Sequence, residues 1–334
     1  MVQHENRSAA RLSGPGPQDD PWEQARGTAR PSWTAFWSEG RRVAGYSLFD
    51  FLHGYVYARW TYLYIGLGVG ERKAPGWLRA AIGAIAALVS QPASTGAADL
   101  RHARGYHGKV LLLDQARQLV RVEEDVCLTN LEHVIPFPVA RDIVLRNPDH
   151  IVALVCPCRS ARESPCLPLD VCLIVGEPFA SLVLQEHRQR ARPISPAEAE
   201  RILEEEHARG HVQHAFFKDA MLGRFYAICN CCPCCCGAMQ SMRSGTPMLA
   251  SSGYVCVVAE HACLACGACE TACPFGALVW AQPAPTVDAE RCMGCGVCVS
   301  ACEAGALTLE RDPAKPAPLI LEHLMAELNP GAGG

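Results

Sequence analysis

The most constraining feature of the chain is a cysteine pattern that occurs twice near its C-terminal end. The first copy, C-x2-C-x2-C-x3-C-P, runs from Cys263 to Pro274, and the same cysteine spacing runs from Cys292 to Cys302. Three thiolates on one tight loop can reach three irons of a cubane, and in runs with this spacing the fourth cysteine ligates the other cluster. Because this crossed ligation ties the two copies together, metal and fold should assemble as one unit.

The pattern therefore predicts two [4Fe–4S] clusters, each with four cysteine ligands. The first ligand set is Cys263, Cys266, Cys269 and Cys302. The second ligand set is Cys292, Cys295, Cys298 and Cys273. A pair of zinc sites is the alternative, but zinc sites usually join two C-x2-C pairs through a longer spacer, which leaves the third cysteine of each run unexplained.

Around these motifs, residues 253–312 resemble the bacterial-type dicluster ferredoxins. The resemblance implies a pseudo-symmetric β-hairpin and short-helix domain, in which each half is a strand, a cluster loop, a short helix and a return strand. Residues 254–258 would be the first strand. The chain departs from the family at Glu303, which stands where the pattern has a proline after the last cysteine. A carboxylate there opposes the addition of an electron, so we expect a somewhat lower potential for the first cluster.

The composition bounds the class of protein. The 334 residues are 49% hydrophobic with a formal net charge of −4, which allows two or three domains and argues against nucleic acid as the main partner. With 20 cysteines and a polar segment 1–20 that contains no apolar leader, the chain favours thiolate ligands in a reducing cytoplasm over disulfides. The most evenly apolar run, Ala80–Val89, is too short to cross a bilayer, so we expect no transmembrane segment.

We expect an α+β protein in which the ferredoxin-type domain follows a mostly helical, cysteine-rich region. The predicted parts are a disordered tail (1–42), a mainly helical region (43–150), a cysteine-rich domain (151–250), the ferredoxin-like domain (253–312) and a Pro/Gly linker with a C-terminal helix (313–334). Within the helical region, helices are predicted in the aromatic segment 46–64 and over 77–89, 109–122 and 139–146. Cys127 is isolated in the sequence, and we expect it to be a free buried thiol.

The predicted cysteine-rich domain contains clear strand and helix signals. A buried strand at 150–155 should deliver Cys156-Pro-Cys158-Arg159 to a turn. The run Ser195-Pro196-Ala-Glu198 combines an N-cap serine, a first-turn proline and a capping glutamate. The helix that starts there should end near Gly210, and an extended segment should follow at 211–217.

Ten cysteines of this domain are candidates for additional metal centres: Cys156, Cys158, Cys166, Cys172, Cys229, Cys231, Cys232, Cys234, Cys235 and Cys236. Six of them crowd into residues 229–236, where neighbours in an extended chain point to opposite sides and one metal cannot bind them all. The alternatives are small buried thiols, a disulfide relay, or one or two further metal centres, of which [4Fe–4S] clusters are favoured. One grouping joins Cys156, Cys158, Cys166 and Cys172 and builds a second site from the 229–236 run; an equally physical grouping mixes the two segments.

Cys-Pro-Cys-Arg combined with Cys-Asn-Cys-Cys-x-Cys-Cys-Cys also resembles a poorly characterised group of large bacterial 4Fe–4S binding proteins, over roughly residues 105–310. This resemblance implies iron–sulfur binding without naming a reaction. We expect an electron carrier or the electron-transfer subunit of a larger redox system, with redox partner proteins as donor and acceptor. The alternatives are an oxidoreductase with substrate chemistry at an additional cluster in 151–250, and an iron–sulfur sensor that contacts DNA through 196–217. No acid–base or nucleophilic catalytic constellation stands out in the sequence.

Overall fold

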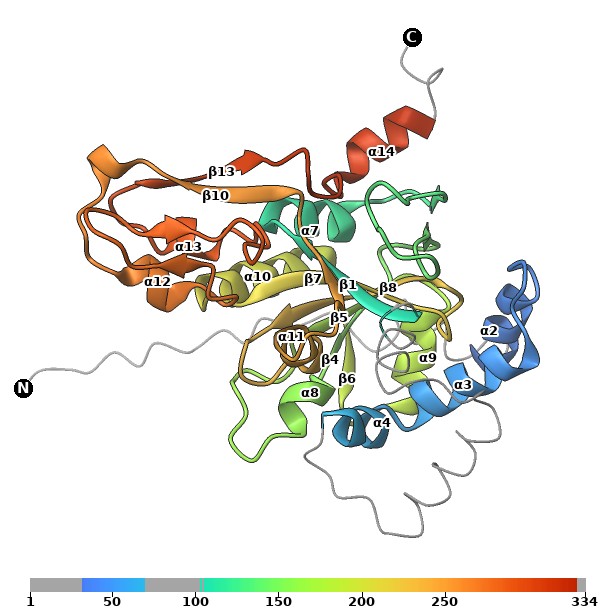
Figure 1. The fold of residues 1–334 in the computed structure, drawn as a ribbon. Helices are drawn as coiled ribbons and strands as arrows, with labels where there is room; N and C mark the ends of the chain where they lie inside the picture. The colour runs from blue at the N-terminus through green and yellow to red at the C-terminus, as the bar shows by residue number, and fades with distance from the viewer. Residues whose placement is uncertain (1–31, 70–102, 104, 329–334) are drawn as a thin grey trace, which may run out of the picture.

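The computed structural model describes residues 32–69, 103 and 105–328 and is centred on a seven-stranded sheet (Figure 1). The strand order is β6-β4-β5-β8-β7-β1-β9. The strands are β1 Tyr106–Leu111, β4 Ile151–Leu154, β5 Cys172–Val175, β6 Ala191–Ile194, β7 Val212–Lys218, β8 Arg224–Cys231 and β9 Leu249–Ala250. All neighbours pair antiparallel except β1 and β9, which are parallel. Because β1 pairs with β7, the sheet includes residues on both sides of position 150.

Alternating side chains along the strands create an apolar layer on each face of the sheet. One face is covered by the helices α7 Leu113–Arg121 and α10 Pro196–Ala208, and its layer includes the fully buried Leu119 and Leu203. The opposite face is covered by α2 Ser32–Gly40, α3 Leu48–Arg59, α4 Thr61–Gly68 and α9 Phe179–Glu186. The short helices α8 Pro157–Ser160 and α11 Gly237–Arg243 begin just after cysteines on this second face. The mixed helix-and-sheet architecture confirms the α+β class at this level.

Two of the helix predictions are confirmed by their local interactions. At the start of α10, the Ser195 hydroxyl accepts a 3.2 Å hydrogen bond from the Glu198 N–H, and Pro196 occupies the first turn. The helix is followed by Gly210 at φ +80°, a conformation that glycine adopts without steric cost. The aromatic segment forms α3 and α4, and it packs Tyr57 into the core.

Two other helix predictions in this region are wrong in part or in full. Residues 106–111 form β1 between β7 and β9, so the helix predicted over 109–122 begins only at Leu113. The helix predicted over 139–146 is instead the strand β3 Ile143–Leu145, which pairs with β2 Val126–Leu128. The β-branched residues of β3 alternate between the core and the outside, which suits a strand. Cys127 occupies the outward position on β2 and is exposed, contrary to the prediction of a buried thiol.

The predicted tail extends too far into the folded chain. Residues 32–40 form α2, in which Phe36 is fully buried against α3 and α9. The Trp33 indole N–H donates a 2.8 Å hydrogen bond to Glu186, which fastens α2 to α9. Because the segment 1–42 is polar overall, its composition did not indicate that one short helix within it has an apolar face. Residues 1–31 of the predicted tail and the helix predicted over 77–89 lie outside the described residues.

Residues 253–312 fold beside α7 and α10 (Figure 1). This C-terminal unit comprises β10 Tyr254–Val258, the 3-10 helix η1 Glu260–Ala262, α12 Ala268–Ala272, β11 Leu278–Val279, β12 Thr286–Val287, α13 Val297–Ser300 and β13 Leu307–Arg311. β10 pairs antiparallel with β13, and β11 pairs with β12, so each half contributes to both ribbons. The last helix, α14 Leu321–Leu328, packs on α7, where Gln118 accepts a 2.9 Å hydrogen bond from the Leu321 N–H.

Candidate metal centres

Two equivalent cysteine loops form the centre of the C-terminal unit. We name residues 263–269 the outer loop and residues 292–298 the inner loop. A glycine in the left-handed conformation precedes the helix of each half, Gly267 at φ +73° and Gly296 at φ +83°. This repeated turn lets the backbone wrap closely around the cysteine sulfurs.

The sulfur of the fourth cysteine in each run accepts a hydrogen bond from an equivalent alanine in the two halves. The backbone N–H of Ala277 donates to Cys273 Sγ, and that of Ala306 donates to Cys302 Sγ, each over 3.3 Å. Hydrogen bonds to ligand sulfurs stabilise thiolates and tune the potential of a cluster. The offset of 29 residues between these pairs is the same as that between the motifs. The sequence repeat is therefore also a repeat of sulfur environments.

The inner loop and Cys273 enclose one buried pocket. The cysteines that line this pocket are Cys256, Cys273, Cys292, Cys295 and Cys298. All three cysteines of the inner loop are buried, and burial raises the pKa of the Cys295 thiol. The structure thus brings the four cysteines of the second predicted ligand set around one space. A buried thiol of raised pKa releases its proton when it ligates a metal, so binding at this pocket is coupled to deprotonation.

Cys256 is a neighbour of this ligand set that the sequence did not single out as a site residue. Its backbone N–H donates to Cys292 Sγ over 3.4 Å, and its thiol lies 3.7 Å from Cys298 Sγ. The alternation of β10 points its side chain inward, and it is 3% exposed. The strand predicted over 254–258 is present and carries this buried cysteine, but the contacts with two candidate ligands come only from the folded structure.

The outer loop has the same shape but a different environment. Cys266 is exposed, Cys263 and Cys302 are half-buried, and Cys269 is buried. Between the first two lies Leu264, whose side chain is 75% exposed. Three of the four cysteines in the first predicted ligand set are therefore exposed or half-buried, whereas three of the four in the second set are buried and only Cys273 is half-buried.

Eight upstream cysteines line a second, larger space, which we name the thiol cavity. Cys232 and Cys235 also belong to another group, described below, and the other six are Cys156, Cys158, Cys172, Cys229, Cys231 and Cys236. The cavity measures about 70 Å³ and has a mostly apolar wall. Cys172 and Cys229 are paired directly across β5 and β8, so the sheet register sets them side by side. The neighbouring thiols of Cys158 and Cys172 lower the pKa of Cys156, and the thiol of Cys236 raises the pKa of Cys231. The second face of the sheet thus gathers six thiols from three separate segments.

A buried ion pair supports this cavity. The Arg159 side chain is 1% exposed and donates to the Glu206 carboxylate over 2.5 Å and to the Asn230 carbonyl over 3.0 Å. Its backbone N–H donates to Cys156 Sγ over 3.5 Å. Burial alone would lower the pKa of Arg159, but the bond to Glu206 raises it on balance. A fixed positive charge beside Cys156 favours thiolates in the cavity. Nothing in the sequence distinguishes Glu206 from the other charged residues of α10.

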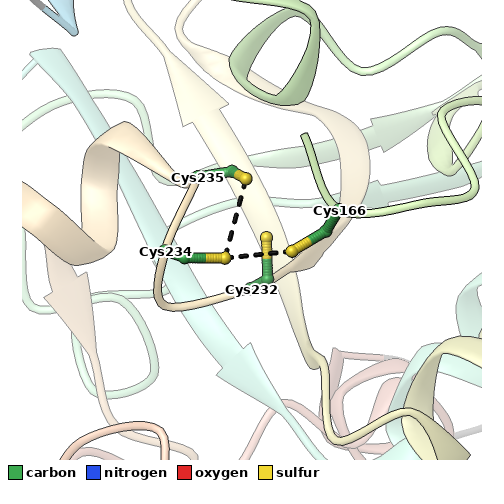
Figure 2. A group of neighbouring side chains, drawn as sticks. All are labelled: Cys166, Cys232, Cys234 and Cys235. Carbon is green, nitrogen blue, oxygen red and sulfur yellow. Dashed lines mark hydrogen bonds between the residues drawn. The ribbon is translucent and has the colours of Figure 1, made fainter. Parts of the chain in front are cut away.

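Cys232 and Cys235 also belong to a tighter group with two other upstream cysteines, which we name the thiol quartet: Cys166, Cys232, Cys234 and Cys235. Figure 2 shows that Cys166 comes from the loop before β5, whereas the other three come from the loop between β8 and α11, and that their sulfurs converge. All four sulfurs lie within 4.8 Å of one another. Cys166 therefore lies with three cysteines of the 229–236 run, as in the grouping that mixes the two segments, and which of these cysteines share a metal stays a prediction.

The inner loop and the thiol cavity belong to one continuous apolar core. Met293, Cys295 and Val297 are buried in the same cluster as Cys156 and Cys231. A polar contact adds to this packing, since His207 Nε2 on α10 lies 2.9 Å from Ser300 Oγ on α13. The inner half of the C-terminal unit is therefore the half that faces the upstream cysteines.

Comparison with known proteins gives one family. A family model described as a 4Fe–4S dicluster domain matches residues 262–306. The chain thus contains a 4Fe–4S dicluster domain, which supports iron–sulfur cofactors and an electron-transfer role. No curated protein matches the chain. None of the helices in the described residues combines the length and the apolar character needed to cross a bilayer.

Proposed function

We propose that the chain is an electron-transfer protein that carries two [4Fe–4S] clusters in its C-terminal domain, as a subunit of a larger redox system in the cytoplasm. One cluster would be held by Cys263, Cys266, Cys269 and Cys302. The other would be held by Cys292, Cys295, Cys298 and Cys273. The observation that carries the proposal is the duplicated cysteine motif on two equivalent loops, inside a matching dicluster domain.

The residues present fit such clusters. The inner set lines one buried pocket, and backbone N–H groups of Cys256, Ala277 and Ala306 point at cysteine sulfurs in positions that tune a cluster. When bound, each cubane supplies one-electron chemistry, usually at low potential. The chain itself contributes the thiolates, the sulfur hydrogen bonds and the burial that sets the local dielectric.

The different exposure of the two loops suggests the direction of electron flow. The outer loop presents Cys266 and the apolar Leu264 to solvent, which suits contact with a redox partner protein. The inner loop packs against the core that holds the thiol cavity. In this proposal, electrons are exchanged with a partner at the outer loop and pass through the inner loop toward the upstream cysteines.

The first test is the iron and acid-labile sulfide content of anaerobically purified full-length protein, with EPR of the reduced state. Two cubanes require about eight irons and eight sulfides per chain. Cys266→Ser should remove the signal of one cluster and leave the other, whereas Cys127→Ser, at an exposed cysteine outside every group, should change neither. Zinc without sulfide in the C-terminal domain would refute the proposal.

A second candidate function is supported by the thiol cavity. Six thiols beside a buried arginine, facing the inner loop across one core, have the donor set of an additional iron–sulfur centre where substrate chemistry could occur. About twelve irons or more per chain would support this oxidoreductase function, provided that Cys172→Ala lowers the count and leaves the dicluster EPR signals intact. A change in the spectrum of the extra centre on addition of small ligands would indicate an open iron. Eight irons in both proteins would exclude the candidate.

A further inference from the structure

The thiol quartet differs from every other cysteine group of the described residues in its size. The sulfurs of Cys166 and Cys234 are 3.0 Å apart and those of Cys234 and Cys235 are 3.6 Å apart, and no pair in the quartet exceeds 4.8 Å. Within the described part of the chain, neither predicted ligand set of the dicluster domain forms so tight a group. The quartet therefore differs in geometry from both predicted ligand sets.

The size of the quartet matches a single metal ion. Four sulfurs that surround one zinc ion at about 2.3 Å in a tetrahedron lie roughly 3.8 Å from one another. A cubane spreads its four cysteines further, because each thiolate binds a different iron at a separate corner. The spacing in the quartet is close to the first geometry.

The loop that supplies three of the thiols is held in shape by side chains. Arg162 donates to the carbonyl of Cys235 over 2.9 Å, and Arg243 donates to the carbonyl of Pro233 over 2.6 Å. Gln240 donates to the carbonyl of Cys234 over 2.9 Å. These bonds fix the loop before any metal binds, and the two guanidinium groups offset the double negative charge that zinc with four thiolates carries.

We propose that Cys166, Cys232, Cys234 and Cys235 bind one Zn²⁺ ion, which fastens the loop before β5 to the loop between β8 and α11. A closed site with four cysteine ligands is typical of structural zinc. The proposal does not depend on the electron-transfer function, because none of these thiols belongs to the dicluster domain.

The ion would also close the thiol cavity. Cys232 and Cys235 line that cavity as well as the quartet. The loop that carries Cys166 is also bonded to the cavity wall. The Leu169 carbonyl accepts a hydrogen bond from the Cys156 N–H, and the Pro168 carbonyl accepts one from the Arg159 side chain. Fastening this loop to the β8–α11 loop would therefore hold Arg159 and Cys156 in place.

The test measures zinc, iron and sulfide in the same anaerobic samples of the full chain. The wild type should contain one zinc per chain, and Cys166→Ser/Cys234→Ser should contain none, with unchanged iron and sulfide. Cys127→Ser is the matched control and should keep its zinc. Absence of zinc from the wild type, or a loss of four irons and four sulfides in the double variant, would overturn the proposal and assign a cubane to the quartet.

Three further measurements cover a variant that fails to fold, a disulfide in place of the metal, and the fastening of the two loops. Zinc X-ray absorption of the wild type should give four sulfur neighbours at about 2.3 Å, and nitrogen or oxygen neighbours in their place would count against the quartet. Mass spectrometry of the alkylated protein should show no Cys166–Cys234 disulfide; finding that bond in anaerobic protein without zinc would overturn the proposal. Limited proteolysis should cut residues 161–171 faster in Cys166→Ser than in Cys127→Ser, and equal rates would contradict the fastening role.

Discussion

The two halves of the dicluster domain have the same motif and the same local turns but opposite surroundings. Cys292, Cys295 and Cys298 of the inner loop are all buried, whereas the outer loop exposes Cys266 and Leu264. The difference arises outside the motif, because the inner loop packs against the core of the central sheet and the outer loop faces solvent. An internal repeat thus places one cysteine loop in the core and the other at the surface.

The largest expected difference is between Cys295→Ser and Cys266→Ser. Each change removes one predicted ligand, but the serine at 295 lies in the core cluster that also contains Met293 and Val297. We expect Cys295→Ser to lose the inner cluster and on the order of 3–5 kcal/mol of stability, and Cys266→Ser to alter only the outer cluster. Thermal unfolding of both proteins measures the loss of stability, and reduced-state EPR shows which cluster is lost. Equal losses of stability would show that the inner half is not the structural one.

A second pair of substitutions tests the same position in both loops. Ala265 at φ +54° corresponds to Gly294 at φ +62°. A β-carbon at Gly294 would collide with the Tyr254 carbonyl and lie 2.5 Å from the Ser252 hydroxyl, whereas Ala265 is exposed.

We therefore expect Gly294→Ala to cost roughly 3 kcal/mol or more. Ala265→Gly should change stability by less than about 1 kcal/mol, because relief of left-handed strain opposes the entropy of glycine. Thermal unfolding under anaerobic conditions compares the two, with iron content as a check. A well-tolerated alanine at 294 would mean that the inner loop is less tightly packed than described.

The buried amine of Lys109, on the central sheet, should make the stability of the protein depend on pH. Lys109 on β1 is fully buried and donates a 2.8 Å hydrogen bond to the Ala317 carbonyl, and burial, with a smaller contribution from Arg311, lowers its pKa to about 7. Between pH 7 and the ordinary lysine pKa of about 10.4, the unfolded chain binds a proton that the folded chain lacks. Stability should therefore rise with pH across this window.

The check is the thermal midpoint of the wild type and of Lys109→Met at pH 7 and pH 9. The variant should be more stable at pH 7 and should gain less on going to pH 9. Some gain should remain, because burial also lowers the pKa of Lys218, to about 8. An identical pH profile for both proteins would show that Lys109 is protonated in the fold.

The smallest expected effect concerns Glu303, which follows Cys302 of the outer ligand set and is exposed. Its carboxylate should lower the potential of the outer cluster, but water screens it, so Glu303→Gln should raise that potential by only about 10–30 mV. Glu303→Pro restores the family residue and should act in the same direction. Redox titration followed by EPR measures both, with Glu322→Gln on α14 as the control. No shift in either variant would remove Glu303 from the tuning of the cluster.

The motif of the dicluster domain could be recognised in the sequence because its spacing is local, and the assignment of its eight cysteines as ligands stays a prediction. The first three cysteines of each run lie within seven residues, with a left-handed glycine between the second and the third and a short helix that includes the third. The helix from Pro196 was predictable for the same reason, since its cap is contained in four residues. The misplaced helices at 109–122 and 139–146 have short apolar runs, which fit a helix or a strand until the sheet supplies a partner.

The sequence by itself determined that this chain has a duplicated iron–sulfur motif and an unusual number of upstream thiols, because spacing along a loop fixes which sulfurs can share a metal. Only the tertiary structure decided how the upstream thiols divide and which half of the dicluster domain faces them. Cys172 meets Cys229 through the register of β5 and β8, and Cys166 joins the 232–235 turn across 66 residues. Such contacts depend on strand pairing and packing between distant segments, which no local spacing encodes.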